Sequence, residues 1–487
     1  MQVAHGASPQ AAAVSRPGLV LGVLALGGSA YALLQSLVVP ALPVLQHDLH
    51  TSTSGVAWVF TSYLLAASVV TPIAGRLGDM FGKKRVLVIA LSGLAAGSLL
   101  AALVTSLPLL IVARTIQGLG GAIFPLAFGI IRDELPRERI AGGIALVSGL
   151  LGIGGGLGIV LAGPILQHLS YHWLFWIPLA VTSVATVAAV VFIPESPLRA
   201  PGSVHWLGGL LLSAWLVALL VAVSEGTTWH WGSAKTIGLF VLSGLLAAAW
   251  VKAESRSRHP LVDMKMMRLS GVWTTNAAAL LLGFGMYSAF VLIPQFVQTP
   301  TSTGYGFGAS VTQSGLFLVP TTIAILITSP IGGRLSNLVG SKVPLVLGSI
   351  LTTIGFVVLA LAGSRWEIYL AAALVGIGVG FAFASMANLI VEAVPPGQTG
   401  VATGMNTIVR TIGGAIGAEV AATVLGAHLL ANGEPTKHAY TITFSICVAV
   451  LLAGVLAALA VPGRTRRQAD SRTLLERASA RTSREAA

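Results

Sequence analysis

Long apolar runs follow one another along almost the whole chain, and each ends in a short polar stretch. A helix that crosses a bilayer needs about 20 mostly apolar residues, and fourteen segments of the chain meet this requirement. We therefore expect an all-α integral membrane protein with fourteen transmembrane helices. The expected spans are residues 18–42, 54–74, 86–104, 107–131, 141–166, 172–193, 206–223, 236–251, 271–297, 311–332, 343–363, 368–390, 400–427 and 441–461.

Composition agrees with this pattern. Of the 487 residues, 55% are hydrophobic and 9% are charged, whereas a soluble domain carries roughly 25% charged residues. The first apolar run follows Arg16 and continues past Gln35 without a small-residue cleavage site, which predicts a retained first span rather than a signal peptide. Cys447 is the single cysteine, so an intramolecular disulfide is excluded.

The net charge of +12 does not point to nucleic acid, because such a partner needs cations gathered on one exposed patch. Here the cations follow the expected spans. With the N-terminus on the inner side, 23 of the 28 Lys and Arg residues fall in inner segments, 3 in outer segments and 2 within spans. Cytoplasmic segments carry the excess of Lys and Arg in membrane proteins. Both termini are therefore expected in the cytoplasm.

One polar phrase occurs twice. The sequence "TPIAGRLGDMFGKK" at residues 71–84 matches "SPIGGRLSNLVGSK" at residues 329–342, at an offset of 258. Each copy closes an apolar run and is expected to open a cytoplasmic loop. Eight expected spans separate the copies, so both share one orientation, which indicates parallel structural repeats.

With these repeats the chain resembles the major facilitator superfamily, and in particular its fourteen-span drug:proton antiporter family. Further motifs that carry the resemblance are "RTIQGLGGA" at 114–122, "SYHWLFWIP" at 170–178, "PLVDMKMMR" at 260–268 and "GMNTIVRTIGGAIG" at 404–417. The resemblance implies a major facilitator fold, with two six-helix halves and two extra central helices. The expected parts are a cytoplasmic N-terminal segment (1–17), an N-terminal bundle (18–199), two linker helices (200–255), a C-terminal bundle (256–461) and a basic cytoplasmic tail (462–487).

The first copy of the phrase, residues 75–85, combines glycines with charge. Its glycines permit close backbone approach and a tight turn between helices. Asp79 can accept hydrogen bonds from a neighbouring helix N-terminus or pair with a nearby cation. The resemblance implies that this cluster latches the two halves together on the cytoplasmic side, with Asp79 facing residues 400–404. The alternative is a basic loop that only sets topology. The candidate gating residues are Gly75, Arg76, Asp79, Gly82, Lys83, Arg85, Arg334 and Asn337.

The second copy has Asn337 where the first has Asp79, and it carries fewer cations. An amide still donates and accepts hydrogen bonds, but it carries no charge that could interact with a helix dipole. We therefore expect an asymmetric latch.

Two further features bear on protons. Arg114 lies about seven residues into its span, where a guanidinium must face protein or water. The resemblance suggests that Arg114 transfers protons or tunes a carboxylate; the alternative is a structural pairing with Gln117 or backbone carbonyls. The first span has Leu34 and Gln35 where the family commonly has a Leu-Asp pair, so it holds no carboxylate. This absence weakens an assignment to cationic drugs.

Glu419 is the only acid well inside an expected span. An intramembrane carboxylate is a functional candidate, and we hypothesise that Glu419 is the proton-coupling site, with Arg114 and Asp133 as further candidates. The alternative is that Glu419 reaches the outer interface and is hydrated there. Arg410 lies nine residues earlier, on the opposite helix face, so the two should not neutralise each other.

Polar and aromatic side chains within the apolar spans are candidates for a weakly polar substrate cavity. Each could equally form an inter-helix hydrogen bond. These candidates are Tyr31, Gln35, Tyr63, Gln117, Asn276, Tyr287, Gln295, Asn388 and Asn406.

These features favour proton-driven export of small lipophilic compounds, antibiotics included, across a bacterial plasma membrane. The chain has no nucleotide-binding loop and no His/Cys cluster with metal spacing, so we expect no enzyme activity and no cofactor. Expected partners are the substrate, protons and lipids, with the protein as a monomer and no nucleic acid. Alternatives are uptake or facilitated diffusion of a neutral solute, and a membrane receptor or scaffold that does not transport.

Overall fold

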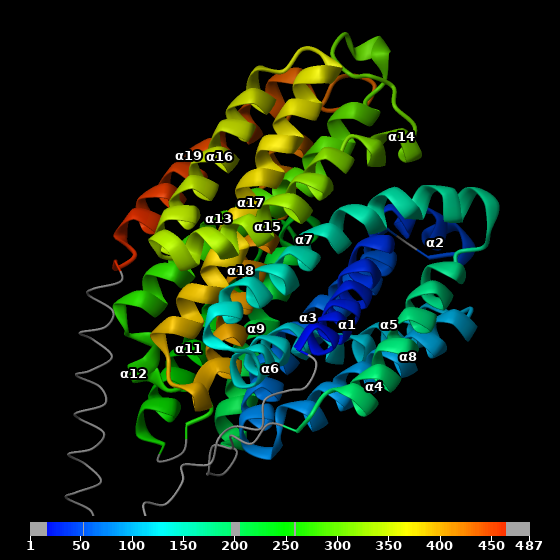
Figure 1. Ribbon diagram of the computed structural model, residues 1–487. Helices are drawn as coiled ribbons and strands as arrows, with labels where there is room; N and C mark the ends of the chain where they lie inside the picture. Colours follow the sequence, from blue (N-terminus) through cyan, green and yellow to red (C-terminus); the bar gives the residue numbers. More distant parts are fainter. Residues whose placement is uncertain (1–16, 52, 196–204, 258–259, 464–487) are drawn as a thin grey trace, which may run out of the picture.

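The computed structural model describes residues 17–51, 53–195, 205–257 and 260–463, and helices make up most of this part of the chain (Figure 1). Of the expected N-terminal segment (1–17) and basic tail (462–487), only residues 17, 462 and 463 lie in the described part. The helices before the linker are α1 (Pro17–Leu37), α2 (Leu42–Asp48), α3 (Thr53–Phe81), α4 (Lys83–Leu103), α5 (Leu107–Gln117), α6 (Ile123–Glu134), α7 (Arg137–His168) and α8 (Trp173–Phe192). Those after it begin with α9 (Trp206–Ser224), α10 (Gly226–Trp229), α11 (Ala234–Arg256) and α12 (Met264–Met267). The remainder are α13 (Ser270–Gln298), α14 (Val311–Leu316), α15 (Val319–Val339), α16 (Lys342–Leu361), α17 (Arg365–Ala393), α18 (Thr399–Ala427) and α19 (Lys437–Ala460).

Within the described ranges, 13 helical segments are long and apolar enough to cross a membrane. The 32-residue α7 is not one of those thirteen, yet it packs between α1 and α15 as a further long helix. Every expected span therefore coincides with a helix or with a helix broken by a short turn. The prediction of an all-α membrane protein is confirmed.

Three expected spans are not continuous helices. The first ends at Leu37, where a 3₁₀ turn (Val39–Ala41) that contains Pro40 leads into α2. The fourth is interrupted by a glycine-rich 3₁₀ segment (Gly118–Ala122) between α5 and α6. The tenth breaks between α14 and α15, just before Pro320. Proline removes a backbone donor and glycine weakens the helix, so both favour such breaks.

The repeat extends over most of each half. Adding 258 to the bounds of α3 gives 311 and 339, which are the first residue of α14 and the last of α15. The same shift carries the α5–α6 segment onto α17 within one residue. The offset first seen in one polar phrase is therefore the spacing between two structurally equivalent halves.

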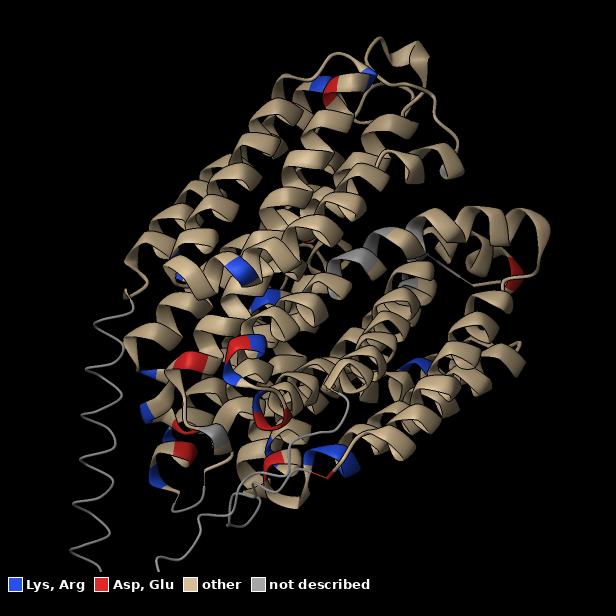
Figure 2. Cartoon of the chain, in the orientation of Figure 1, with Lys and Arg blue, Asp and Glu red and all other residues tan. Residues whose placement is uncertain are grey.

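The halves meet where α3 and α6 pack on α18 and where α7 packs on α15 and α17. Each half has its own cluster of buried apolar side chains. A third cluster joins α9 and α11 to α18 at the boundary. Of the two linker helices, α9 packs on both α3 and α18, while α11 packs mainly on α9. Figure 2 shows that most charged residues gather in the lower part of the view, toward one end of the helices.

The repeated phrase is not a loop, and this expectation was wrong. Helix α3 continues through the glycines and Asp79 to Phe81, and α4 starts at Lys83. The whole turn is Gly82, whose φ of +111° suits glycine. In the second copy α15 runs to Val339 and the turn contains Gly340, with φ +87°. The end of α3 packs at Gly75 against Gly400 of the other half and buries Asp79. The end of α15 stays largely exposed at Arg334 and Asn337.

Candidate functional site

The two halves come closest at Gly75 of α3 and Gly400 of α18. A Cβ added to Gly75 would lie 2.7 Å from the carbonyl carbon and oxygen of Gly400. The repeat reproduces this contact between α15 and α7, where a Cβ on Gly333 would lie 3.1 Å from the Cα of Gly142. At the offset of 258 residues, Gly333 corresponds to Gly75 and Gly400 corresponds to Gly142. Backbone approach this close leaves no room for a side chain at Gly75 or Gly333.

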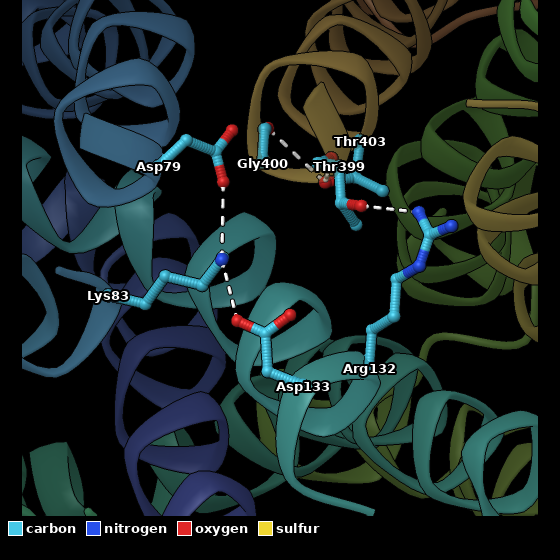
Figure 3. Close-up of polar contacts among 7 residues, drawn as sticks. All are labelled: Asp79, Lys83, Arg132, Asp133, Thr399, Gly400 and Thr403. Atoms are coloured by element: carbon cyan, nitrogen blue, oxygen red, sulfur yellow. Dashed lines mark hydrogen bonds and ion pairs between the residues drawn. The ribbon is translucent and has the colours of Figure 1, made fainter. Parts of the chain in front are cut away.

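One turn after Gly75, a buried charge cluster surrounds Lys83. Its ammonium lies 2.7 Å from Asp133 Oδ2 and 3.5 Å from Asp79 Oδ1, and all three side chains are almost completely buried. Figure 3 places the Asp79 carboxylate beside the first turn of α18. The partial positive charge of this helix N-terminus favours the Asp79 carboxylate.

Arg132, at the end of α6, crosses to the other half. Its Nη1 donates to the Thr399 hydroxyl at 2.6 Å (Figure 3). Its Nη2 donates to the Val394 carbonyl at 3.0 Å. Our sequence reasoning missed Arg132, although an arginine beside Asp133 in the last turn of a helix was a signal. We use the name latch for Gly75, Asp79, Lys83, Arg132, Asp133, Thr399 and Gly400.

The second copy makes weaker polar contacts. The exposed Asn337 donates from Nδ2 to the Glu138 carbonyl at 3.1 Å. Arg334 is exposed as well. Of the other predicted gating residues, Arg85 is 68% exposed and lies 3.5 Å from Glu195. Arg76 lines a separate cavity together with Asp263.

Arg114 is fully buried among partners in its own half. Its Nε donates to the Val59 carbonyl at 2.9 Å, and its Nη1 donates to Gln117 Oε1 at 2.7 Å. The guanidinium lies 4.3 Å from the centre of the Tyr63 ring. No carboxylate pairs with it in the described part of the chain. This is the structural pairing that the sequence left open as an alternative.

A cavity lies between the halves, beyond the latch. Tyr31 and Gln35 of α1, Tyr287 of α13 and Arg410 of α18 line it. An adjoining cavity shares Arg410 and is also lined by Asn406, Phe124 and Phe383. The first has a volume of about 20 Å³, enough for about one water molecule. The halves must therefore separate before a larger molecule can enter.

The other predicted cavity residues lie elsewhere. Tyr63 contacts Tyr31, with ring centroids 5.7 Å apart. Three amides form inter-helix hydrogen bonds: Gln117 with Ser98, Asn276 with Asn406, and Asn388 with the Ala141 carbonyl. Gln295 is exposed and lines neither of these two cavities. A polar residue type inside an apolar run does not reveal which face of the helix it occupies.

Arg410 is the cavity residue that our sequence reasoning missed. It is 8% exposed, and its guanidinium lies 4.4 Å from the centre of the Phe383 ring. Its Nε has no hydrogen-bond partner. The signal was available, since an arginine inside an apolar span must face protein or a water-filled space.

Glu419 faces the linker rather than the cavity. It is half-buried next to Thr227 and close to Glu225, which is itself buried. One turn later on α18, the Thr423 hydroxyl accepts a hydrogen bond of 3.1 Å from Trp231 Nε1. The Oε1 atom of Glu419 has no hydrogen-bond partner. Glu419 and Arg410 form no ion pair.

Comparisons with known proteins agree with this architecture. The family model described as Major Facilitator Superfamily matches residues 24–418 and again 304–483. The chain is 29% identical to the tetracenomycin C resistance and export protein of Streptomyces glaucescens, over 83% of this chain and 74% of the relative. It is also 29% identical to multidrug resistance protein 3 of Bacillus subtilis, over 80% and 75% respectively.

A solved structure supports the fold alone. The human organic anion transporter MFSD10 (TETRAN) superposes with a TM-score of 0.65 at 16% identity, over 91% of this chain and 99% of that one. The family match, the two equivalent halves and the cavity between them lead to one conclusion: the chain belongs to the Major Facilitator Superfamily and is a transporter, not an enzyme.

Proposed function

We propose that the protein exports small hydrophobic or amphipathic compounds, such as drugs or antibiotics, from a bacterial cytoplasm in exchange for protons. The observation that carries the proposal is the cavity at the boundary of the halves, which Tyr31, Gln35, Tyr287 and Arg410 line. The names of two relatives, an export protein and a multidrug resistance protein, support export as the direction.

The latch and the symmetry of the repeats support alternating access. The latch closes one end of the cavity, and the excess of cations at that end favours its assignment to the cytoplasm. Opening requires α3 and α18 to part at Gly75 and Gly400 and Arg132 to leave Thr399. The contacts between α7 and α15 occupy the equivalent place in the repeat, so the same rocking motion strains them too.

Glu419 is our proposed coupling site. Helix α18 carries Thr399 of the latch, Arg410 of the cavity and Glu419, which lies about 30 Å from the helix start at 1.5 Å per residue. A proton that binds Glu419 would remove its charge beside Glu225 and shift the packing of α18 against α10. Motion of one helix would then couple the proton to both the cavity and the latch.

Transport in proteoliposomes tests this proposal. The purified protein is reconstituted, a pH gradient is imposed, and the accumulation of a panel of amphipathic dyes of both charges is followed by fluorescence. We expect accumulation of at least one dye that disappears when nigericin collapses the gradient. Equilibration without accumulation would instead identify a facilitator, and no transport of any dye would favour a receptor or scaffold.

A further inference from the structure

The cavity carries a cation without a counter-ion. Arg410 is more than nine-tenths buried and lines both adjoining cavities, and its Nε lacks a hydrogen-bond partner. The residues that line these cavities include no Asp and no Glu. A buried guanidinium without a carboxylate is costly, so the site favours a negative charge.

The acids on the lining helices lie toward the helix ends and have other partners. Asp133 lies five residues after Phe128 of α6, about 8 Å along the helix, and pairs with Lys83. Glu392 lies five residues after Ala387 of α17, and its carboxylate accepts a hydrogen bond from Ser341. Thr71 of α3 lines the cavity, and Asp79 lies eight residues further, about 12 Å along the helix. Glu419 lies nine residues after Arg410, about 14 Å along α18 and on the opposite face. Asp79 is paired with Lys83. Coulomb attraction falls with distance, so none of these acids neutralises Arg410 as a bound anion in the cavity would.

The surroundings hold the guanidinium in place. Its planar group lies over the Phe383 ring. Gly414, one turn after Arg410, leaves room for Tyr287, because a Cβ there would overlap the tyrosine ring. Tyr31, Tyr287 and Gln35 line the same cavity and supply further hydrogen-bond donors. Aromatic faces, neutral donors and one fixed cation suit an aromatic molecule that carries a carboxylate, sulfonate or phenolate.

We infer that the cavity selects anionic amphipathic aromatic compounds, with Arg410 as the residue that determines charge specificity. The inference rests on the proposed export function and names its substrate class. It excludes lipophilic cations as the preferred substrates, which agrees with the missing acid in the first span at Leu34 and Gln35.

Two ions of the same shape and opposite charge test the inference. Binding of radiolabelled tetraphenylborate and tetraphenylphosphonium to the full-length protein in neutral detergent is measured by equilibrium dialysis against empty micelles. We expect the anion to bind about tenfold more tightly or better, because a guanidinium in a site of low dielectric attracts the anion and repels the cation. Arg410→Gln should remove this preference, whereas Arg410→Lys should retain it within about threefold.

Arg365→Gln is the matched control. Arg365 also lies over an aromatic ring, that of Phe307 at 5.8 Å, but it is exposed on the first turn of α17. Its replacement should leave both affinities unchanged. Three outcomes would overturn the inference. The wild type could bind the cation as tightly as the anion or more tightly, it could bind neither ion saturably, or folded Arg410→Gln could keep the anion preference. If Arg410→Gln does not fold, the inference is tested by the anion and cation affinities of the wild type and of Arg410→Lys.

The outcomes separate the inference from the proposed function. Anion preference in binding, without gradient-driven transport of any dye, would leave the inference standing and remove the export proposal. Gradient-driven export of cationic dyes alone would support the export proposal and overturn the inference.

Discussion

Arg132 of the N-terminal half donates a hydrogen bond of 2.6 Å to the hydroxyl of Thr399 in the C-terminal half (Figure 3). The bond joins the last turn of α6 to the first residue of α18. Because a hydrogen bond from a charged donor contributes about 1.5–3 kcal/mol, its loss should shift the balance between closed and open states by about tenfold or more. Variants of Arg132 therefore provide a way to measure how strongly one end of the cavity is held closed.

Replacing Arg132 by Gln should open the latch. The variant loses charge-assisted contacts to Thr399 and Val394, so a cysteine placed at Thr407 in the cavity should react faster with a maleimide applied from the latch side. Cys447→Ala supplies the cysteine-free background. Arg137→Gln, an exposed arginine at the start of α7, is the control and should leave the labelling rate unchanged. Equal rates in the two variants would mean that Arg132 does not hold the closed state.

The two copies of the phrase should differ in their sensitivity to mutation. Asp79→Asn removes a buried charge that pairs with Lys83, and we expect the efflux rate to fall about tenfold while membrane insertion persists. Asn337→Ala removes one exposed hydrogen bond, which should change the rate less than twofold. Unchanged efflux by Asp79→Asn would take this carboxylate out of the transport cycle.

Gly75→Ala should force α3 and α18 apart, because the new Cβ would meet the Gly400 backbone. We expect slower efflux and faster labelling of the cysteine at Thr407. Gly142→Ala is a matched control, since a Cβ added there meets nothing within 4 Å. If both variants transport alike, the close approach at Gly75 is dispensable.

Cysteine labelling in intact cells tests the orientation. A cysteine at Thr228, exposed between α9 and α11, should react with an impermeant reagent from outside. A cysteine at Ser257, after α11, should not react. Exterior labelling at Ser257 would contradict the placement of both termini in the cytoplasm.

Sequence patterns predicted the number of long helices and the equivalence of the halves, because a bilayer imposes the length and apolar character of each span. They also located Gly75, Asp79 and Lys83 of the latch, but not Arg132. They did not reveal that α3 runs to Phe81, because contact with another half can extend a helix beyond the bilayer. Nor did they separate Arg410, which lines the cavity, from Arg114, which is bound to Gln117. That difference depends on tertiary packing.

Substrate-induced proton movement in proteoliposomes tests proton exchange most directly. A pH-sensitive dye is trapped inside, a substrate found in the dye panel is added, and the internal pH is followed for the wild type, Glu419→Gln and the control Glu434→Gln, an acid in the loop after α18. We predict that the wild type and the control move protons opposite to the substrate, while Glu419→Gln still binds substrate but moves none. Proton movement by Glu419→Gln at the wild-type rate would contradict its role as the coupling site, and substrate transport by the wild type without any change in internal pH would contradict antiport itself.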